Sequence, residues 1–522
     1  MRKVLRQICV LFLFLPVICF ATQWPVAPTN ISTPGVNASE QQIAIDPNGN
    51  IVAVWIENTI VKSSAATVNG GWSSNIATLS GSGASEPQVK IDLNGTATAI
   101  WVENGIVTRS SCPLNGSWTG SIALSSSGAS APELAIDLSG NLVAVWTEGG
   151  LIQSSTQLVG GSWSVSPDTI SSAGASSPQV AISSNGTVIA VWQGVIGSTP
   201  TVYAASKSIN GSWGAEVAVS LANVNSSYPQ VAIDSLGNAT CIWFSYTLTG
   251  SVYSNVILQS SLLSSGGSWS TPVNISASGF KNPADLVSCV AMGPNQTAVA
   301  AWTNSYDGSY FSCEWNIFSD GNWSVPVRNV NQNLLAYSLD LCSIPKGDVF
   351  QVWMSYDPIE EYLSVQGAVN DLSSLSKVFF NSWTMSNSNE NGYPVVASNS
   401  LDSNLFLAMA WMSFDSANNI IQATQSSFAF TEPPSGLGVV PQVNNFGVTS
   451  EISNILSWTA SPSSNLLNYL IFRDGLFLGY VDSNTLQFID PNRTVGETVT
   501  YSVASSDSQG CQSALVSINF TN

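Results

Sequence analysis

One stretch decides the fold: Gln42-Ile43-Ala44-Ile45-Asp46-Pro47-Asn48-Gly49-Asn50-Ile51-Val52-Ala53-Val54-Trp55. An apolar run ends in an Asp-x-x-Gly turn, and a second apolar run then closes on tryptophan. Copies of this pattern end at seven further tryptophans, spaced 45 to 59 residues apart: Trp101, Trp146, Trp192, Trp243, Trp302, Trp353 and Trp411. Self-similarity at this period is typical of β-propellers, whose blades run at about 40–50 residues each.

Each repeat divides into four short segments with strand character. The first two are almost continuously apolar, which predicts that both of their faces are covered. The third is represented by Ile152-Gln153-Ser154. The fourth is expected to begin at a Gly-Ser-Trp element or a variant of it, at Trp72, Trp118, Trp163, Trp213, Trp269, Trp323 and Trp383. Blades stacked face to face around an axis would provide the required cover.

The two ends of the repeat region predict a closed ring. The segment from Trp24 to Ser32 is similar to a lone fourth strand, whereas the last repeat has a third strand near 420–422 and no Gly-Ser-Trp element after it. Pairing the surplus strand with the incomplete repeat would remove both exposed edges. We therefore expect an all-β chain with an eight-bladed β-propeller over 22–430, closed by an N-terminal strand. Two smaller sheet assemblies are the alternative.

The repeat resembles the tandem Pro-x-Val-Ala-x-Asp-x-x-Gly-Asn-Ala-x-Ala-Val-Trp repeats of bacterial exported β-propeller-like proteins. Pro178-Gln179-Val180 and Pro229-Gln230-Val231 begin two of the matching copies. The resemblance covers about residues 22–430. It implies an exported propeller and carries no information on activity.

The region 431–522 is expected to form a second domain after the linker Glu432-Pro433-Pro434-Ser435-Gly436. It resembles a fibronectin type III domain through Trp458, Tyr469 and the strand Tyr501-Ser502-Val503-Ala504. About 90 residues fit a seven-stranded sandwich of this kind. The resemblance implies a spacer or a binding accessory.

The first 21 residues are predicted to be a signal peptide. Met1–Gln7 is basic, Ile8–Phe20 is apolar and Ala21 is a small residue suited to cleavage. No later segment has about 18 uninterrupted apolar residues, so no transmembrane segment is expected in the mature chain. We expect a monomer that is secreted or held at the cell surface.

Composition excludes several function classes. The net charge of −19 leaves too few cations to neutralise the phosphates of a nucleic acid. The chain contains no histidine, which excludes Ser–His and Cys–His nucleophiles and histidine-based metal sites. Only Arg109 and Arg328 fall within 22–430, too few for the three arginines with which sialidases grip a carboxylate.

Three repeated side-chain series allow a structural or a functional interpretation. The repeat tryptophans are expected to pack between blades; exposed sugar platforms are the alternative. Asp46, Asp92, Asp137 and Asp234 begin turns, where aspartate accepts backbone hydrogen bonds and the following glycine tolerates positive φ. Glu57, Glu103 and Glu148 are interpreted as solvated loop residues, although three carboxylates together could bind Ca²⁺. We otherwise expect no cofactor, no metal and no catalytic residue.

The spacing between the second and fourth strands points to a binding face. It is 17 residues in the first three repeats and 21, 26, 21 and 30 in the next four. Insertions in repeat proteins tend to fall on one face, often the binding face, and tyrosine suits recognition. The predicted partner-binding residues are Tyr246, Tyr253, Tyr306, Tyr310, Phe311, Tyr356 and Tyr362.

These observations predict a non-enzymatic binding or adhesion protein that recognises a protein or glycan partner through one face of the propeller. Two alternatives stay open. The first is a polysaccharide hydrolase or lyase that works through carboxylates alone, although no specific pair of carboxylates stands out in the sequence. The second is a structural component of the cell envelope.

Overall fold

The computed structural model describes residues 22–522 with gaps. The gaps are 24–25, 280–281, 294–295, 305–311, 320, 329–334, 344–348, 358–361, 371–378, 389–390, 402–403, 416, 430–431, 446–449, 464–465, 475, 508–512 and 514. The predicted signal peptide, 1–21, lies outside the described residues. Among the residues that are described, no helix is long and apolar enough to cross a membrane.

Over residues 22–429 the described strands form eight antiparallel sheets, numbered here in chain order. Their first strands are β3 (Ala38–Ile45), β7 (Ala84–Ile91), β11 (Ala129–Ile136), β15 (Ser176–Ile182), β19 (Asn225–Ile233), β23 (Ser288–Met292), β28 (Leu335–Ser343) and β32 (Asn391–Leu401). Their second strands are β4 (Asn50–Glu57), β8 (Ala97–Glu103), β12 (Leu142–Glu148), β16 (Thr187–Ile196), β20 (Ala239–Thr249), β24 (Ala298–Asn304), β29 (Val349–Asp357) and β33 (Asn404–Phe414).

The third strands are about as long as the first two, whereas most fourth strands have only two residues. The third strands are β5 (Ile60–Thr67), β9 (Ile106–Cys112), β13 (Leu151–Gln157), β17 (Thr199–Ser208), β21 (Val252–Leu263), β25 (Ser312–Ser319), β30 (Tyr362–Asn370) and β34 (Asn419–Ala429). The fourth strands are β6 (Ala77–Thr78), β10 (Ile122–Ala123), β14 (Asp168–Thr169), β18 (Val217–Ala218), β22 (Val273–Asn274), β26 (Asn322–Trp323) with β27 (Val327–Arg328), and β31 (Phe379–Ser388). Most fourth strands therefore begin after the Gly-Ser-Trp element and not at it, which corrects the predicted boundary. A short 3-10 helix, η1 (Pro283–Asp285), precedes β23.

Strand β2 (Thr29–Asn30), near the N-terminus, completes the eighth sheet. It pairs with β34 in the order β2-β34-β33-β32, with Thr29 opposite Ala423. This is the pairing expected from the surplus N-terminal strand. A further short strand, β1 (Thr22–Gln23), runs parallel to β31 in the seventh sheet.

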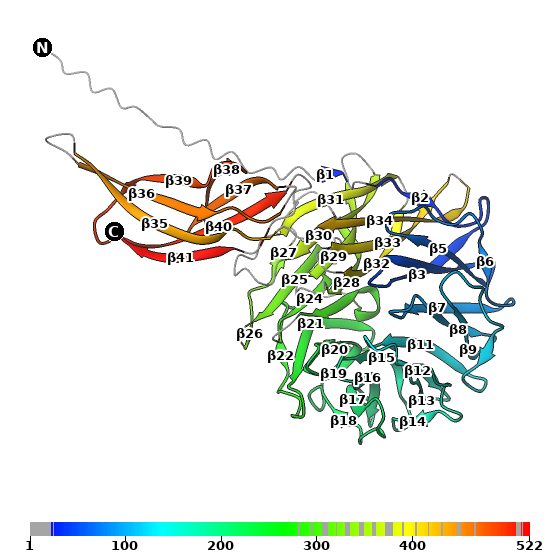
Figure 1. Ribbon diagram of the computed structural model, residues 1–522. Helices are drawn as coiled ribbons and strands as arrows, with labels where there is room; N and C mark the ends of the chain where they lie inside the picture. Colours follow the sequence, from blue (N-terminus) through cyan, green and yellow to red (C-terminus); the bar gives the residue numbers. More distant parts are fainter. Residues whose placement is uncertain are drawn as a thin grey trace, which may run out of the picture.

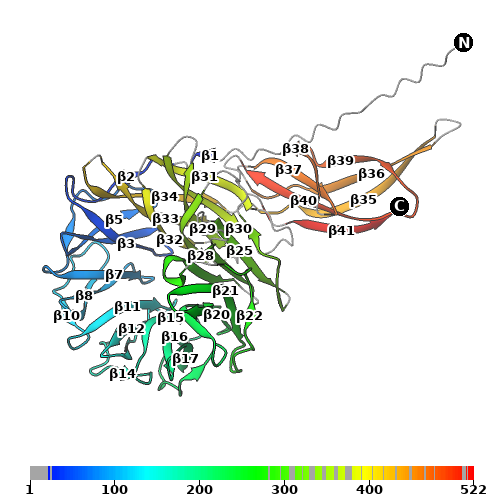
Figure 2. The ribbon, with the colours of Figure 1, turned by 180° about the vertical axis from the view of Figure 1, so that it is seen from behind.

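The first strands surround a common centre, as Figure 1 and the reverse view in Figure 2 show. Each contacts the first strand of the next sheet, from β3 to β7 and onward to β32, and β32 contacts β3 in turn. The circle of contacts is therefore closed, and the innermost strands line its axis.

The turns between first and second strands form as the repeated aspartate predicts. Asp46 Oδ1 accepts hydrogen bonds from the backbone N–H groups of Asn48 and Asn50, at 2.9 and 2.8 Å. Gly49 adopts a φ of 79°, which a residue with a Cβ rarely does. The same bonds recur at Asp92, Asp137 and Asp234.

The second-strand tryptophans pack between neighbouring sheets, which confirms the structural interpretation of this series. Trp146, for example, is fully buried and packs with Ile100 and Val102 of the preceding sheet. Trp55 of the first sheet packs against Ala408 and Ala410 of the last. Buried rings cannot serve as sugar platforms, so that alternative is wrong for this series.

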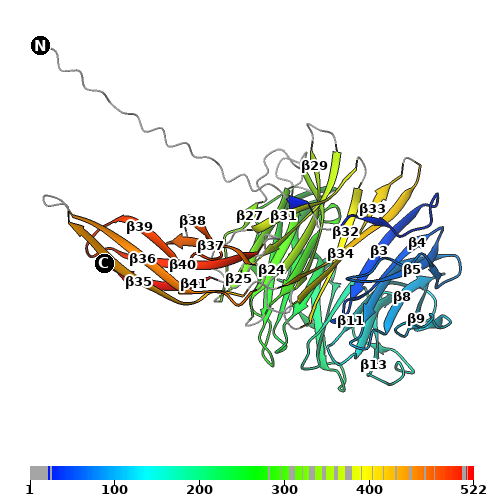
Figure 3. The same cartoon turned by 45° about the horizontal axis from the view of Figure 1, so that its top comes forward.

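The C-terminal strands form two further sheets that extend to one side of the ring (Figures 2 and 3). One sheet has the order β35 (Ser435–Asn445), β36 (Ser450–Thr459), β39 (Gln487–Arg493), and the other has the order β38 (Leu476–Asp482), β37 (Leu466–Arg473), β40 (Thr498–Asp507), β41 (Val516–Thr521). Trp458, Tyr469 and Tyr501 lie in their shared core, and the rings of Trp458 and Tyr469 have centroids 5.3 Å apart.

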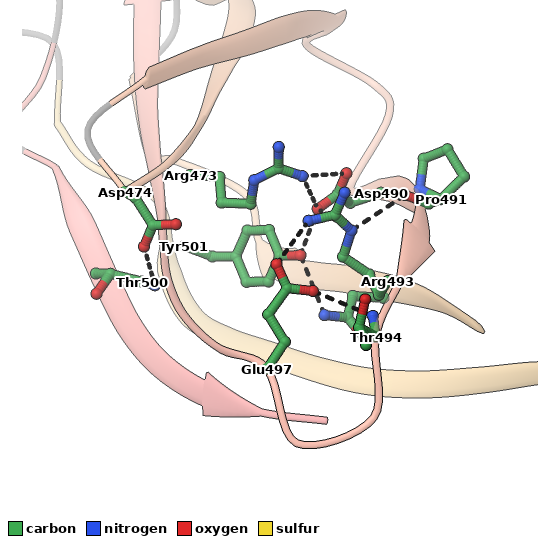
Figure 4. A network of polar contacts seen from close by, with 10 residues as sticks. Arg473, Asp474, Asp490, Pro491, Arg493, Thr494, Glu497, Thr500 and Tyr501 are labelled. Atoms are coloured by element: carbon green, nitrogen blue, oxygen red, sulfur yellow. Dashed lines mark hydrogen bonds and ion pairs between the residues drawn. The ribbon is translucent and has the colours of Figure 1, made fainter.

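A polar network joins these two sheets (Figure 4). The Asp490 carboxylate on β39 accepts two hydrogen bonds from Arg473 Nη1 on β37, at 2.9 and 2.8 Å, and lies 3.4 Å from Arg493 Nε. The Tyr501 hydroxyl on β40 also donates to Asp490 and accepts a bond from Asn454. Burial and the bond to Asp490 raise the pKa of Tyr501 to about 12, so Tyr501 is a neutral donor at physiological pH.

Replacing Asp490 by Ala is expected to destabilise this two-sheet unit by about 3–5 kcal/mol, because two arginines and a buried hydroxyl lose their shared acceptor. Hydrogen exchange of the β37 and β40 amides in the full chain measures the change. Asp482→Ala, at an exposed turn position, is the matched control and should cost no more than about 1 kcal/mol. Equal effects of the two substitutions would show that the network adds nothing to stability.

Candidate functional site

A bulge interrupts the pairing of most first strands with their second strands. The register shifts in the first to fifth, seventh and eighth sheets, for example between Ser39 and Gln42 and between Ser85 and Gln88. In six of these bulges the extra residue has a positive φ of 50–57°: Glu40, Glu86, Ala131, Ser177, Tyr228 and Tyr393. Bulges re-aim side chains and are common next to active sites.

These bulges lie at one end of the central axis. Because the strands are antiparallel, the start of each first strand lies beside the end of its second strand, as the pair Ala38 and Glu57 shows. The bulges therefore share a face with the hairpins between second and third strands, including the longer ones of the fourth and fifth sheets. We call this end of the axis, with the six bulge residues and a pocket that three of them line, the axial mouth.

Two exposed carboxylates at the axial mouth are held in place by backbone donors. Glu40 Oε2 accepts a hydrogen bond of 2.6 Å from the backbone N–H of Glu86 in the next sheet. Glu86 Oε2 accepts an equivalent bond of 2.6 Å from Ala131 in the sheet after that. Both residues, together with Glu133, line a pocket of about 330 Å³. Three glutamate residues from three successive sheets thus line one pocket.

Glu133 differs from the other two in its environment. Burial raises the pKa of its carboxyl to about 7, and the negative charge of Glu86 adds to the rise. A hydrogen bond of 2.9 Å from Gln179 Nε2 and the positive charge of Lys90 lower this pKa in part. A substantial fraction of Glu133 is therefore protonated near neutral pH. A proton-donating carboxyl beside two exposed carboxylates is the pattern of general acid–base catalysis.

Below the mouth, one repeated strand position places small side chains in the lining of the axis. A cavity of about 510 Å³ is bordered by first strands of all eight sheets. At the strand position equivalent to Ala44, the other sheets also place alanine or cysteine in the lining, except for the second sheet, which has Lys90 there. Asp340 in the seventh sheet is at the position equivalent to Glu133 in the third sheet. Each of the two residues pairs with the residue that precedes the tryptophan of the second strand of its sheet. Burial raises the pKa of Asp340 to about 6, against hydrogen bonds from the Val396 and Leu341 N–H groups and the charge of Lys90.

Glu57, Glu103 and Glu148 lie in strands and not in loops. Each ends a second strand and accepts a hydrogen bond of 2.7–3.0 Å from the indole N–H of the tryptophan two residues before it. Glu57 is 3% exposed, so the interpretation as a solvated residue is wrong there. Within the described part of the chain, no group of three or more His, Cys, Asp and Glu side chains could hold a metal ion.

Four of the seven predicted aromatic residues lie on the face of the axial mouth within the described part of the chain. Tyr246 and Tyr253 are half-buried in the fifth-sheet hairpin, with ring centroids 5.3 Å apart, and Tyr246 bonds to Ser227 at 3.0 Å. Tyr306, Tyr310 and Phe311 lie outside the described residues. Tyr356 and Tyr362 belong to β29 and β30 beside their connecting turn, and only their backbone is described. Their role in binding remains a prediction.

Sequence reasoning missed the residues that form the mouth itself. Glu40, Glu86, Glu133, Tyr228 and Tyr393 were not singled out, although a usable signal exists. In five sheets the bulge residue stands immediately before a proline, as in Glu86-Pro87 and Tyr228-Pro229. Aligning the repeats on that proline would have placed Glu86, Tyr228 and Tyr393 at one strand position.

Comparison with known proteins gives fold likeness only. Neither a protein-family model nor a curated protein matches the chain. Among solved structures, the Dos1 propeller is 10% identical with a TM-score of 0.45, over 78% of this chain and 96% of that one. The polysaccharide lyase Uly1 is 8% identical with a TM-score of 0.41, over 59% and 85%. An endo-arabinase from Bacteroides thetaiotaomicron is 11% identical with a TM-score of 0.29, over 56% and 92%.

The prediction of a non-enzymatic binding or adhesion protein is corrected by these neighbours, most of which are named as carbohydrate-active enzymes. That prediction rested on finding no carboxylate pair, because the mouth carboxylates lie about one repeat apart and only the fold brings them together. At such low identity the likeness does not assign an activity, so the case for one has to come from the residues of the mouth. What the repeated sheets and the closed circle of first-strand contacts establish is the fold: the chain is built as a β-propeller of repeated all-β blades.

Proposed function

We propose that this protein is an exported glycoside hydrolase whose active site is the axial mouth. Its proposed organisation is a signal peptide over 1–21, an eight-bladed propeller over 22–430 that is closed by β2, and a fibronectin type III-like domain over 431–522. The eight sheets, the closed circle of first-strand contacts and the two C-terminal sheets support this organisation. The observation that carries the activity is the pocket in which Glu133, with a pKa of about 7, meets Glu40 and Glu86.

The three carboxyl groups divide the chemistry between them. Glu133 donates its proton to the glycosidic oxygen as the C1–O bond breaks, and the sugar leaves as an alcohol. Glu86 accepts a proton from a water molecule whose oxygen attacks C1. This pairing of an acid with a base is the usual means of glycoside cleavage by two carboxyl groups. Glu40 fixes the Glu86 backbone through the 2.6 Å hydrogen bond to its N–H and acts as a positioning residue.

The backbone donors give the acceptor carboxylate a defined orientation. A hydrogen bond from an N–H group to a carboxylate is about twice as strong as one between neutral groups. The bond from the Ala131 N–H to Glu86 Oε2 leaves the second carboxylate oxygen of Glu86 to accept the proton from water. The bulges are the device that makes this possible, because the positive φ of Ala131 turns its N–H toward the preceding sheet.

A polysaccharide panel at pH 6 tests the activity through the release of reducing ends. The wild-type protein is expected to cleave at least one member, and Glu86→Gln to reduce that rate by about 100-fold or more, because amides do not accept the proton. Asp168→Asn, on the exposed outer strand β14, is the control and should retain the wild-type rate. The proposal fails if no polysaccharide yields reducing ends, or if Glu86→Gln cleaves as fast as the wild type.

A further inference from the structure

Two tyrosines flank the carboxylates at the axial mouth. Tyr228 and Tyr393 are bulge residues of the fifth and eighth sheets, and their side chains are 42% and 67% exposed. Neither is among the aromatic residues expected from loop length. Large aromatic side chains at this exposure, each re-aimed by a bulge, offer flat surfaces to a ligand.

Each tyrosine is held by its neighbours. The carbonyl of Tyr393 accepts a hydrogen bond from Gln41 Nε2, which follows Glu40 in the first sheet. Tyr228 lies near Tyr246 and Tyr253, and burial together with these two hydroxyls and Asp285 raises the pKa of Tyr228. The sheets that carry Tyr393, Glu40, Glu86, Glu133 and Tyr228 are the eighth, first, second, third and fifth, so the carboxylates lie between the two tyrosines along the circle.

Among the residues that the structure describes, the exposed charges at the mouth are acidic. Glu40 and Glu86 are exposed, and Asp285 lies close to Tyr228. Lys90, the cation that lies near Glu133, belongs to the lining of the deeper cavity. Near a protein surface, opposite charges attract each other and like charges repel. The mouth therefore favours cationic groups and disfavours uronates and sulfated sugars.

We propose that the axial mouth binds a polysaccharide of amino sugars with free ammonium groups. The polysaccharide stacks on Tyr393 at one side of the mouth and on Tyr228 at the other, and its ammonium groups face Glu40 and Glu86. This inference takes its site from the proposed function and adds the class of substrate. Neutral sugars could stack on the same rings, but they would leave the exposed carboxylates without a counter-charge.

Calorimetric titration of the Glu133→Gln protein, which is not expected to consume the ligand, measures the binding. The probes are hexamers of glucosamine, N-acetylglucosamine and galacturonic acid. The glucosamine hexamer should bind most tightly and the galacturonic acid hexamer should not bind measurably. Tyr393→Ala and Tyr228→Ala should each weaken binding of the glucosamine hexamer by about 2- to 13-fold, the equivalent of the stacking energy of one ring.

Tyr480→Ala is the matched control, because Tyr480 is 66% exposed on the C-terminal sheets, away from the mouth. Its binding should equal that of the parent protein. If the glucosamine hexamer adsorbs to the acidic surface as a whole, both mouth variants will bind it as tightly as the parent protein, and the inference is overturned. Equal binding of the three hexamers would also overturn it.

The cleavage assay separates this inference from the proposed function. If a polysaccharide is cleaved in a Glu86-dependent way but the mouth tyrosines do not affect its binding, the substrate class is wrong and the hydrolase stands. If the glucosamine hexamer binds in a tyrosine-dependent way but nothing is cleaved, the binding site stands and the hydrolase is wrong.

Discussion

The Glu133→Gln protein is expected to lose cleavage by about 10²- to 10⁴-fold, the contribution of one general acid. Glutamine keeps the size of the side chain and can still accept the hydrogen bond from Gln179, so the pocket should keep its shape. The amide cannot transfer a proton to the leaving oxygen. The measurement is the rate of reducing-end release on the polysaccharide that the wild type cleaves best.

The pH dependence of the wild type supplies an independent check on the role of Glu133. An acid with a pKa of about 7 loses its proton as the pH rises through 7, so the cleavage rate should fall above that value. This alkaline limb should be absent from the residual activity of Glu133→Gln. A limb that survives the substitution would assign the acid to another residue.

The same pKa also has a consequence for stability, which falls as the pH rises. The folded protein holds the Glu133 proton more tightly than the unfolded chain, whose glutamate has an ordinary pKa of 4.5. Between about pH 4.5 and 7 the unfolded chain loses this proton first, so the wild type loses stability as the pH rises through that window. Glu133→Gln avoids this loss and should melt above the wild type at pH 8, but not at pH 4. An inactive variant that is more stable cannot owe its inactivity to misfolding.

The sequence predicts the sheets far better than it predicts the site. Apolar runs that end in Asp-x-x-Gly or in tryptophan specify strands, turns and inter-sheet packing locally, and Asp46 and Trp146 illustrate how directly residue type sets structure. The mouth carboxylates carry no such signature. Glu86 and Glu133 become partners only because neighbouring sheets place the starts of their first strands side by side. A bulge also interrupts the alternation of side chains between the two faces of a strand, from which the direction of a side chain is usually predicted.

The tryptophan-bound glutamates show the converse error. Glu57 stands at the end of an apolar run, where a carboxylate normally reaches water. The nearby indole N–H of the buried Trp55 needs an acceptor, however, and Glu57 Oε1 supplies one at 2.7 Å while also accepting a bond from the Thr33 N–H at 2.8 Å. A donor and an acceptor two residues apart on one strand lie on the same side of the sheet, so this pairing could have been predicted from spacing alone.

The eighth and first sheets, which meet at the seam where the ring closes, also carry residues of the proposed binding site. The eighth sheet carries Tyr393 and the first carries Glu40, and both belong to the proposed binding site. At this seam the N-terminal segment runs beside β34: Ile31 is 4% exposed and its N–H bonds to the Ile421 carbonyl at 2.9 Å. An open ring would therefore both expose the edge of β34 and separate one tyrosine from the carboxylates.

A disulfide across this seam is expected to stabilise the protein by about 5 kcal/mol, near the upper end for such crosslinks, because it closes a loop of almost four hundred residues in the unfolded chain. Asn30 and Gln422 are opposite each other on β2 and β34, and their side chains already meet at 3.0 Å, so Asn30→Cys with Gln422→Cys is the suitable pair. Cys112 and Cys511 are replaced by serine to prevent exchange. The measurement is the free energy of unfolding with the crosslink oxidised and reduced, which cancels the loss of the Gln422 bond to the Trp411 indole.

The control places the second cysteine at Gln153, in the third strand of the third sheet, where a closed ring brings no N-terminal strand. A crosslink that forms between positions 30 and 422, but not between 30 and 153, shows that β2 pairs with β34. The oxidised protein should also retain cleavage, because the closed ring is the active state. If positions 30 and 422 fail to crosslink while the chain is folded, the circle is open, and the eighth sheet would no longer hold Tyr393 beside the first sheet.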